Sequence, residues 1–301
     1  MAASRRNFFK LLGAGTGAAL IAGIPTTDKA SAARTPVMTE SVGKAMLYDS
    51  EKCVGCRACQ NGCKNWNDLP AEEEDHGIVY DNPKNLSART WTIIKAREYT
   101  FNGKQSLMLC RYQCMHCTEA SCESVCPTGA ISYQGAAVVV DQEWCIGCGY
   151  CVQACPYGVP HRDHGFNAGP VGKCTFCVDR QADGLEPACV ASCPAGALVF
   201  GDRDDMLVYG KSRVQQLKAE GYDKANLYGE NELGGLHALY VLTESPSVFN
   251  LPETPPVATK STGYRWLSGA IAGLVLAIIP AFLVMKGRNK PVQASDERGE
   301  G

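Results

Sequence analysis

The sequence has no long run of lysine or arginine, and its two signs of charge nearly cancel. The 29 Lys and Arg residues stand against 31 Asp and Glu residues, so the formal net charge is −2, and charged residues make up 20% of the chain. Binding to the phosphate backbone of nucleic acid depends on clustered positive charge. The composition therefore excludes nucleic acid as an expected partner.

Recognisable catalytic patterns are also missing. The sequence contains no nucleophile–base pair, no Gly-rich phosphate loop and no carboxylate dyad, and four histidines stand singly: His76, His161, His164 and His237. We interpret these histidines as structural or solvated. Any substrate chemistry is therefore expected on a separate subunit rather than in this chain.

Cysteine, in contrast, is abundant. The chain has 17 cysteines in 301 residues. Because 45% of its residues are apolar, it can form a hydrophobic core and does not need disulfides to replace one. Sixteen of the cysteines fall into four groups of four, and Cys110 is left over. The spacing within the groups must decide their chemistry.

The first and third groups have the spacing C-x2-C-x2-C-x3-C of bacterial ferredoxins. The second and fourth are the same motif with its second gap lengthened. In chain order the four motifs are Cys53, Cys56, Cys59, Cys63; Cys114, Cys117, Cys122, Cys126; Cys145, Cys148, Cys151, Cys155; and Cys174, Cys177, Cys189, Cys193.

This spacing suits a [4Fe-4S] cluster. A tight loop supplies three thiolates to three corners of the cluster, and in two-cluster ferredoxins the fourth ligand comes from the partner motif. The last cysteine of such a motif is usually followed by proline, as Pro127, Pro156 and Pro194 follow here, whereas Lys64 follows Cys63. We therefore expect four [4Fe-4S] clusters, which makes the chain a carrier of single electrons.

Zinc sites, disulfides and solitary buried thiols are the alternatives to iron–sulfur clusters for these cysteines. Zinc sites use C-x2-C pairs but seldom place three cysteines within seven residues. Disulfides suit an exported protein, but cysteines three residues apart bridge poorly, and the total of 17 is odd. A solitary buried thiol is the interpretation of Cys110 alone.

The order of the motifs indicates an α+β fold of two pseudo-symmetric ferredoxin-like units. Residues 114–159 form one compact unit, with strands near 129–133 and 137–140 around a Gly-centred turn. The first motif must then pair with the last, so residues 45–113 and 160–205 form the other unit, closed across the chain. The sequence at 196–200 repeats the pattern after Cys126, which supports this pairing.

Insertions and an extension complete the fold class. Alternating residues at 91–97 and 105–109 flank Asn102-Gly103, which predicts a β-hairpin inserted in the first unit. A helix is predicted from a cap at Asp204 to Glu220. We assign 206–262 to a C-terminal extension and linker.

The N-terminus predicts export. Arg5 and Arg6 precede two phenylalanines and a weakly apolar stretch, and an A-x-A cleavage site follows at residues 30–32. Residues 1–32 are therefore expected to be a twin-arginine signal peptide.

The C-terminal region predicts a membrane anchor. The 20-residue stretch Trp266–Met285 has no charge and is long enough to cross a hydrocarbon core of about 30 Å. We expect a transmembrane helix over 264–287 and a tail over 288–301. Together with the export signal, this predicts a single-pass protein of the inner membrane with its cluster domain on the periplasmic or extracytoplasmic side.

Several segments between the cysteines carry a resemblance to a known family. The chain from about Tyr48 to Pro252 resembles the beta subunit of respiratory formate dehydrogenase. The segments that carry it are Cys53-Val54-Gly55-Cys56-Arg57-Ala58-Cys59, Val79-Tyr80-Asp81-Asn82-Pro83, Leu86-Ser87-Ala88, Trp91-Thr92, Cys145-Ile146-Gly147-Cys148-Gly149-Tyr150-Cys151, Glu186-Pro187-Ala188-Cys189-Val190, Gly221-Tyr222-Asp223, Leu227-Tyr228 and Gly234-Gly235.

The resemblance implies a non-catalytic subunit that relays electrons from a molybdenum- or tungsten-bis(pterin) subunit, which oxidises formate, to a membrane cytochrome b subunit and quinone. It also implies the ligands of each cluster. These are Cys53, Cys56, Cys59 with Cys193; Cys174, Cys177, Cys189 with Cys63; Cys114, Cys117, Cys122 with Cys155; and Cys145, Cys148, Cys151 with Cys126.

One feature departs from that family, because this chain carries its own export signal. The electron-transfer subunit of quinone-linked nickel-iron hydrogenases resembles the chain in this respect and is the alternative. An anchored iron–sulfur sensor is a third hypothesis, and purification of the chain without a redox partner would favour it.

Overall fold

The computed structural model describes residues 43–72, 83–101, 103–162 and 169–258, together with Gly273 and Ile278. The predicted signal peptide, the tail and, apart from those two residues, the predicted membrane helix lie outside this part, as do His76 and His164. Within the described residues, no helix is both long enough and apolar enough to cross a membrane.

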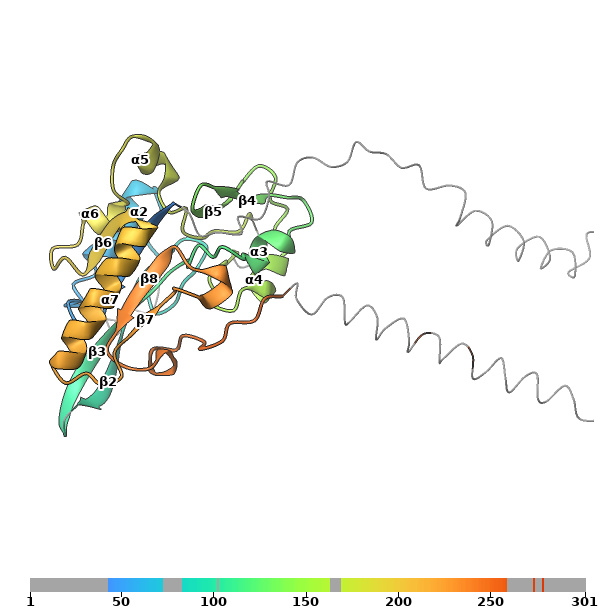
Figure 1. The fold of residues 1–301 in the computed structure, drawn as a ribbon. Helices are drawn as coiled ribbons and strands as arrows, with labels where there is room; N and C mark the ends of the chain where they lie inside the picture. Colours follow the sequence, from blue (N-terminus) through green and yellow to red (C-terminus); the bar gives the residue numbers. More distant parts are fainter. Residues whose placement is uncertain are drawn as a thin grey trace, which may run out of the picture. The chain divides into compact units, whose positions relative to one another are not determined.

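A four-stranded sheet joins segments from both ends of the described chain, in the order β6-β1-β8-β7 (Figure 1). β1 runs antiparallel to β6 and parallel to β8. Two of the strands come from beyond residue 205, so the expected extension is an integral part of this sheet. The strands are β1 (Lys44–Asp49), β6 (Leu198–Asp202), β7 (Asn226–Tyr228) and β8 (Ala238–Leu242).

Both faces of the sheet are covered, as the side chains of β1 illustrate. Successive side chains of a strand point to opposite faces. Ala45 and Leu47 join a core on the side of helix α7 (Arg203–Ala219). Met46 and Tyr48 join a second core, which also contains cysteines of the first and fourth motifs. One face of β1 thus carries the helix, and the other carries the cysteine region.

Helix α7 is held to β1 by a buried ion pair. Arg213 Nε donates to Asp49 Oδ2 at 2.8 Å, and Arg213 Nη2 donates to Glu51 Oε2 at 2.7 Å. The predicted cap at Asp204 is wrong, because strand β6 ends at Asp202 with extended backbone and Asp202 is itself the N-cap residue. Asp204 lies in the first turn instead.

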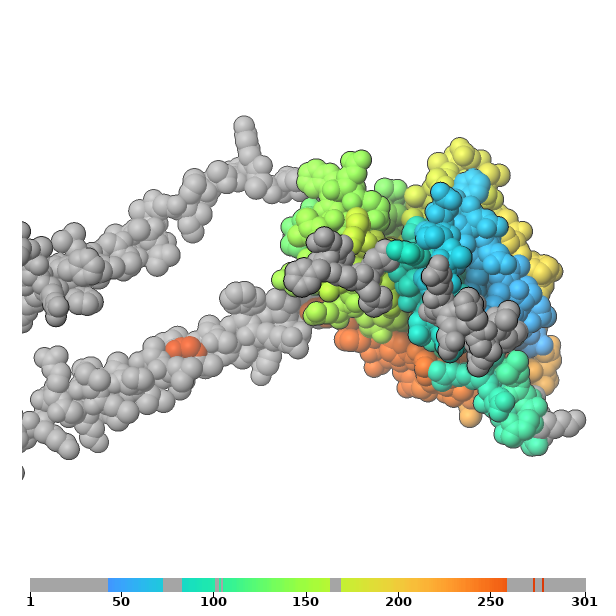
Figure 2. All heavy atoms as spheres, turned by 180° about the vertical axis from the view of Figure 1, so that it is seen from behind, coloured from blue at the N-terminus to red at the C-terminus, as the bar shows by residue number. Residues whose placement is uncertain are grey.

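Helix α2 (Ala58–Trp66) and helix α6 (Ala188–Ala191) contact each other, although about 120 residues separate them in the sequence. Figure 1 shows them side by side, and Figure 2 shows from behind that their regions, blue and yellow, adjoin at the surface. The contact requires glycine at position 62, because a Cβ there would lie 2.2 Å from Ser192 Oγ and 3.0 Å from Ala188 O. This close approach brings the first motif against the fourth.

The predicted hairpin is present and is longer than expected. β2 (Ile93–Phe101) pairs with β3 (Lys104–Tyr112) along their whole length, around a two-residue connection at 102–103. The end of β3 leads directly into the second cysteine motif. The hairpin therefore delivers Arg111 and Cys114 to the interior.

Residues 114–159, the predicted second unit, contain two short helices and two short strands. Helices α3 (Ser121–Ser124) and α4 (Tyr150–Ala154) contact each other and carry cysteines of the second and third motifs. β4 (Ile131–Gln134) pairs with β5 (Ala137–Val140), close to the predicted strands. This pair of short helices repeats the arrangement of α2 and α6. Short elements α5 (Val178–Ala182), η2 (Glu232–Gly234) and η3 (Pro246–Phe249) complete the described chain.

Candidate metal centres

All seventeen cysteines lie in the described residues, and all are free thiols. In that part of the chain, no three Cys, His, Asp or Glu side chains converge at the spacing of a single-ion site. Sixteen of the thiols instead gather in four sets. The seventeenth, Cys110, is buried in the core, and its Sγ approaches the carbonyl oxygen of Arg111 at 3.7 Å.

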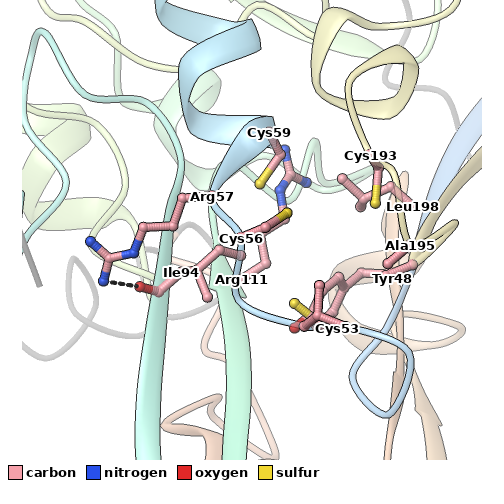
Figure 3. Close-up of a pocket in the computed structure, with 12 residues that line it drawn as sticks. Tyr48, Cys53, Cys56, Arg57, Cys59, Ile94, Arg111, Cys193, Ala195 and Leu198 are labelled. Atoms are coloured by element: carbon pink, nitrogen blue, oxygen red, sulfur yellow. Dashed lines mark hydrogen bonds between the residues drawn. The ribbon is translucent and has the colours of Figure 1, made fainter. Parts of the chain in front are cut away.

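Set 1 consists of Cys53, Cys56, Cys59 and Cys193, which line one cavity with an empty volume of about 320 Å³ (Figure 3). Burial raises the pKa of Cys59 to about 11; Arg111 lowers it, whereas Cys53 and Cys193 are among the thiols that raise it. The first motif thus contributes three cysteines, and the fourth motif contributes its last.

Set 2 consists of Cys63, Cys174, Cys177 and Cys189, which line a second cavity with an empty volume of about 300 Å³. Burial raises the pKa of Cys63 to about 12, and Cys189 and Cys177 raise it further. The Phe176 N–H donates to Cys174 Sγ at 3.4 Å. Here the fourth motif contributes three cysteines, and the first motif contributes its last.

Sets 3 and 4 are defined by the mutual electrostatic effects of their thiols. In the second unit, burial raises the pKa of Cys117 well above its ordinary value, and burial raises that of Cys151 to about 11. Neighbouring thiols raise both pKa values further, and these thiols complete the sets. Set 3 consists of Cys117 with Cys114, Cys122 and Cys155, and set 4 consists of Cys151 with Cys145, Cys148 and Cys126.

The loops that hold the thiols depend on left-handed backbone. Arg57 follows the second cysteine of the first motif at φ 60°, and Gly149 holds the equivalent place in the third motif at φ 78°. His116 and Phe176 precede the second cysteine of the second and fourth motifs at φ 47° and 61°. Gly55 and Gly147 hold that same preceding place in the first and third motifs at φ 70° and 66°, so all four motifs share this turn, and the first and third add a second left-handed residue after the cysteine. Such turns point successive backbone N–H groups into one concavity, which favours anionic sulfur.

The thiol sets fit iron–sulfur clusters chemically. A thiolate, not a thiol, binds metal, and burial together with neighbouring thiols makes deprotonation unfavourable in every set. A metal cation reverses this balance, because a coordinating thiol is deprotonated outright. Three thiolates from one loop and a fourth from the partner motif are the donor set of a [4Fe-4S] cluster. The residues present therefore fit that group.

Neighbouring sets meet through particular thiols, so the sets form a row. After the larger effect of burial, a thiol of the adjacent set raises the pKa of three cysteines: Cys189 acts on Cys59, Cys114 on Cys174, and Cys151 on Cys122. Each of these pairs also shares one hydrophobic core cluster, so set 1 adjoins set 2, set 2 adjoins set 3, and set 3 adjoins set 4.

The two ends of the row face solvent. Of the seventeen cysteines, Cys56 of set 1 and Cys148 of set 4 are exposed, whereas all four thiols of set 2 are buried. Large apolar side chains stand exposed beside the same ends, Val54 at set 1 and Ile146 at set 4. The row of thiol sets therefore has one exposed cysteine at each end.

Two buried cations near the thiol sets, Arg111 and Lys173, were not predicted from the sequence as residues of the site. Arg111 is 1% exposed and Lys173 is 3% exposed. Lys173 Nζ donates to the carbonyl oxygens of Val138 and Cys174. Burial raises the pKa of nearby Cys122 to about 12, and the charge of Lys173 opposes that rise. The only sign of these cations in the sequence is that each stands close before a cysteine motif.

Two of the histidines named in the sequence analysis lie in the described residues, and both bond backbone carbonyls. His161 Nδ1 lies 2.9 Å from Val159 O, and His237 Nδ1 lies 2.9 Å from Lys44 O.

A mixed α+β fold with paired cysteine motifs defines an iron–sulfur protein of the ferredoxin-like class. The family described as "4Fe-4S dicluster domain" matches residues 105–203.

Comparison with curated proteins narrows the class. The chain is 38% identical to the formate dehydrogenase iron-sulfur subunit of Haemophilus influenzae over 85% of each chain. It is 41% identical to the nitrate-inducible formate dehydrogenase iron-sulfur subunit of Escherichia coli, over 77% of this chain and 79% of that one. Hydrogenase-2 operon protein HybA of Escherichia coli O157:H7 is 32% identical over 95% of each chain. The chain belongs to the family of formate dehydrogenase iron–sulfur subunits.

Proposed function

We propose that sets 1 to 4 each hold one [4Fe-4S] cluster and that the chain relays electrons along this row between two partner subunits. The observation that supports the proposal is that cysteines of neighbouring sets share hydrophobic core clusters, with an exposed cysteine in set 1 and another in set 4. When bound, such clusters transfer single electrons. The chain's own contribution is to hold the thiols, to bury all four cysteines of set 2 and to leave one cysteine exposed at each end.

The orientation of the row follows from the exit of the chain toward its predicted membrane helix. The backbone N–H of Ala258, the last residue before the undescribed segment, donates to Ser121 Oγ at 3.0 Å. Ser121 directly precedes Cys122 of set 3. Because the described chain ends beside set 3, we assign set 4 to the membrane side and set 1 to the catalytic side.

We assign these two ends to the partners that the family resemblance implies. A molybdopterin subunit carrying Mo or W would donate electrons from formate at set 1, and a membrane cytochrome b subunit would accept them at set 4 for delivery to quinone. The twin-arginine signal and the helix over 264–287 would place the complex on the extracytoplasmic side of the inner membrane.

A nickel-iron hydrogenase is the second candidate for the partner. The match to HybA, which spans 95% of both chains, favours it, and the export signal predicted for residues 1–32 agrees with it. The row of clusters and its orientation would be the same with either partner.

The test is to purify the chain from gently solubilised membranes, identify its partners by mass spectrometry and assay formate- and hydrogen-dependent dye reduction. The proposal predicts a pterin-binding partner, formate activity and about sixteen iron atoms per chain. A nickel-iron partner with hydrogen uptake would assign the relay to hydrogenase. Isolation of the iron-loaded chain without a redox partner would overturn the relay function.

A further inference from the structure

Arg111 is an unusual residue of the interior because it is a buried cation without a carboxylate. It lies near the end of β3 and is 1% exposed. Within the described part of the chain it forms no ion pair, whereas the buried Arg213 bonds Asp49 and Glu51. An unpaired charge in the interior is costly, so it normally has a compensating partner.

The hydrogen bonds of the Arg111 guanidinium leave most of its capacity unused. Its Nη1 lies 3.1 Å from Met46 Sδ, and a thioether is a weak acceptor. Its Nε is buried and has no hydrogen-bond partner among the described protein atoms. A guanidinium carries five N–H donors in a rigid fork. Donors are therefore available for a group that the protein atoms do not supply.

The position of Arg111 indicates which group that is. Its side chain lines both the set 1 cavity and the set 2 cavity. In Figure 3 its guanidinium lies beside Cys59, whereas Arg57 points away toward the Ile94 carbonyl. The thiols that act on it electrostatically come from both sets: Cys59 belongs to set 1, and Cys174 and Cys189 belong to set 2.

We propose that Arg111 is a positioning residue for electron transfer, placed between sets 1 and 2 so that its fixed positive charge stabilises the reduced clusters of both. This inference rests on the cluster assignment of the proposed function. The cost of burying the guanidinium without a carboxylate is offset by the thiolate-bound clusters on its two sides.

The consequence for the relay is electrostatic. Reduction of a cluster adds one electron and one negative charge, and no bond forms or breaks. Cluster potential depends on nearby charge, hydrogen bonds to sulfur and exposure. Because water is excluded around Arg111, its charge is poorly screened. Arg111 therefore raises the midpoint potentials of both clusters of the first unit and helps electrons to enter the row.

The experiment compares Arg111→Gln with Arg111→Lys in the intact complex, because both remove the guanidinium but only lysine retains the charge. Iron content is measured first, and each midpoint potential is then measured by redox titration followed by electron paramagnetic resonance. In Arg111→Gln, the equilibrium constant for reduction of the set 1 and set 2 clusters should fall at least tenfold, about 59 mV for one electron. Sets 3 and 4 should not change.

The lysine variant separates charge from packing. It should retain four clusters and potentials close to those of the wild type, even if the glutamine variant loses iron from the first unit. If both variants have wild-type potentials, or if both lose the same clusters to the same degree, the charge role of Arg111 is wrong. A wild-type chain with fewer than four clusters would refute the proposed function itself.

Discussion

Cys114 and Cys174 lie in different units and different sets, yet both are buried in one small core together with Val159. Cys114 also raises the pKa of Cys174, after the larger effects of burial and of Cys63. This contact is the junction between the two halves of the proposed relay. In the proposed relay, an electron that enters at set 1 passes the junction between Cys114 and Cys174 to reach set 4.

Removal of Cys114 should interrupt the relay at that junction. Cys114→Ala in the intact complex is expected to lose the set 3 cluster, about four iron atoms per chain. Formate-dependent reduction of a dye that accepts electrons before the junction should persist, whereas quinone reduction should fall to background. The matched control is Cys110→Ala, which should keep full iron content because Cys110 belongs to no set. Equal quinone activity in the two variants would contradict the proposed order.

The exchange of last cysteines between motifs can be tested with two single variants. Cys63 lines the set 2 cavity, and Cys193 lines the set 1 cavity. Cys63→Ala should therefore remove the cluster of Cys174, Cys177 and Cys189, and Cys193→Ala should remove that of Cys53, Cys56 and Cys59. The two losses can be distinguished by their spectra and midpoint potentials. If each variant loses the cluster of its own motif, the exchanged pairing is wrong.

The two ends of the row should dock different partners. Val54 and Ile146 follow the first cysteine of the first and third motifs, and they are 66% and 67% exposed. A charge buried at an interface is costly unless it is paired. Val54→Asp should weaken binding of the catalytic subunit and abolish formate-dependent dye reduction. Ile146→Asp should spare dye reduction and abolish quinone reduction.

Each of these variants serves as the control for the other, and co-purification of each partner gives a second reading. Loss of the membrane subunit from Val54→Asp, with the catalytic subunit retained, would reverse the orientation assigned to the row.

Acid should destabilise the fold through His237. Burial lowers the pKa of His237 below its ordinary value of 6.5; its hydrogen bond to Lys44 raises it, and Arg203 lowers it. Below pH 6.5 the unfolded chain binds a proton that the folded chain does not, so the free energy of unfolding falls by about 1.4 kcal/mol per pH unit. The loss stops once the pH reaches the lowered folded-state pKa.

His237→Asn retains a donor for the Lys44 carbonyl and removes the titrating group. Urea unfolding of both proteins at equal iron content, between pH 5 and 7, should show a smaller loss of stability on acidification in the variant. Parallel pH profiles would exclude this role for His237.

Local patterns predicted the local parts of the fold well. The four cysteine motifs, the hairpin around Asn102-Gly103 and the short strands near 131–140 follow from spacing and turn chemistry, which act over a few residues. The N-cap of α7 lies two residues before the predicted position, at Asp202 instead of Asp204, because the end of strand β6 and not a side-chain cap sets it.

Long-range features were not visible in the sequence. The parallel pairing of β8 with β1 joins residues about 190 positions apart, and no local pattern encodes such a contact. The same holds for Gly62, whose role exists only because α6 packs against it. In the sequence Arg111 looks like any other arginine of a β-strand, and only the folded hairpin shows that it lines two cavities.

The central claim is that one chain carries a continuous row of four clusters. A redox titration of the purified complex, followed by electron paramagnetic resonance and combined with iron analysis, tests it most directly. The claim predicts four separately reducible clusters and about sixteen iron atoms in this chain, with magnetic interaction between neighbours in the row. Two clusters only, or zinc in place of iron in any set, would contradict it.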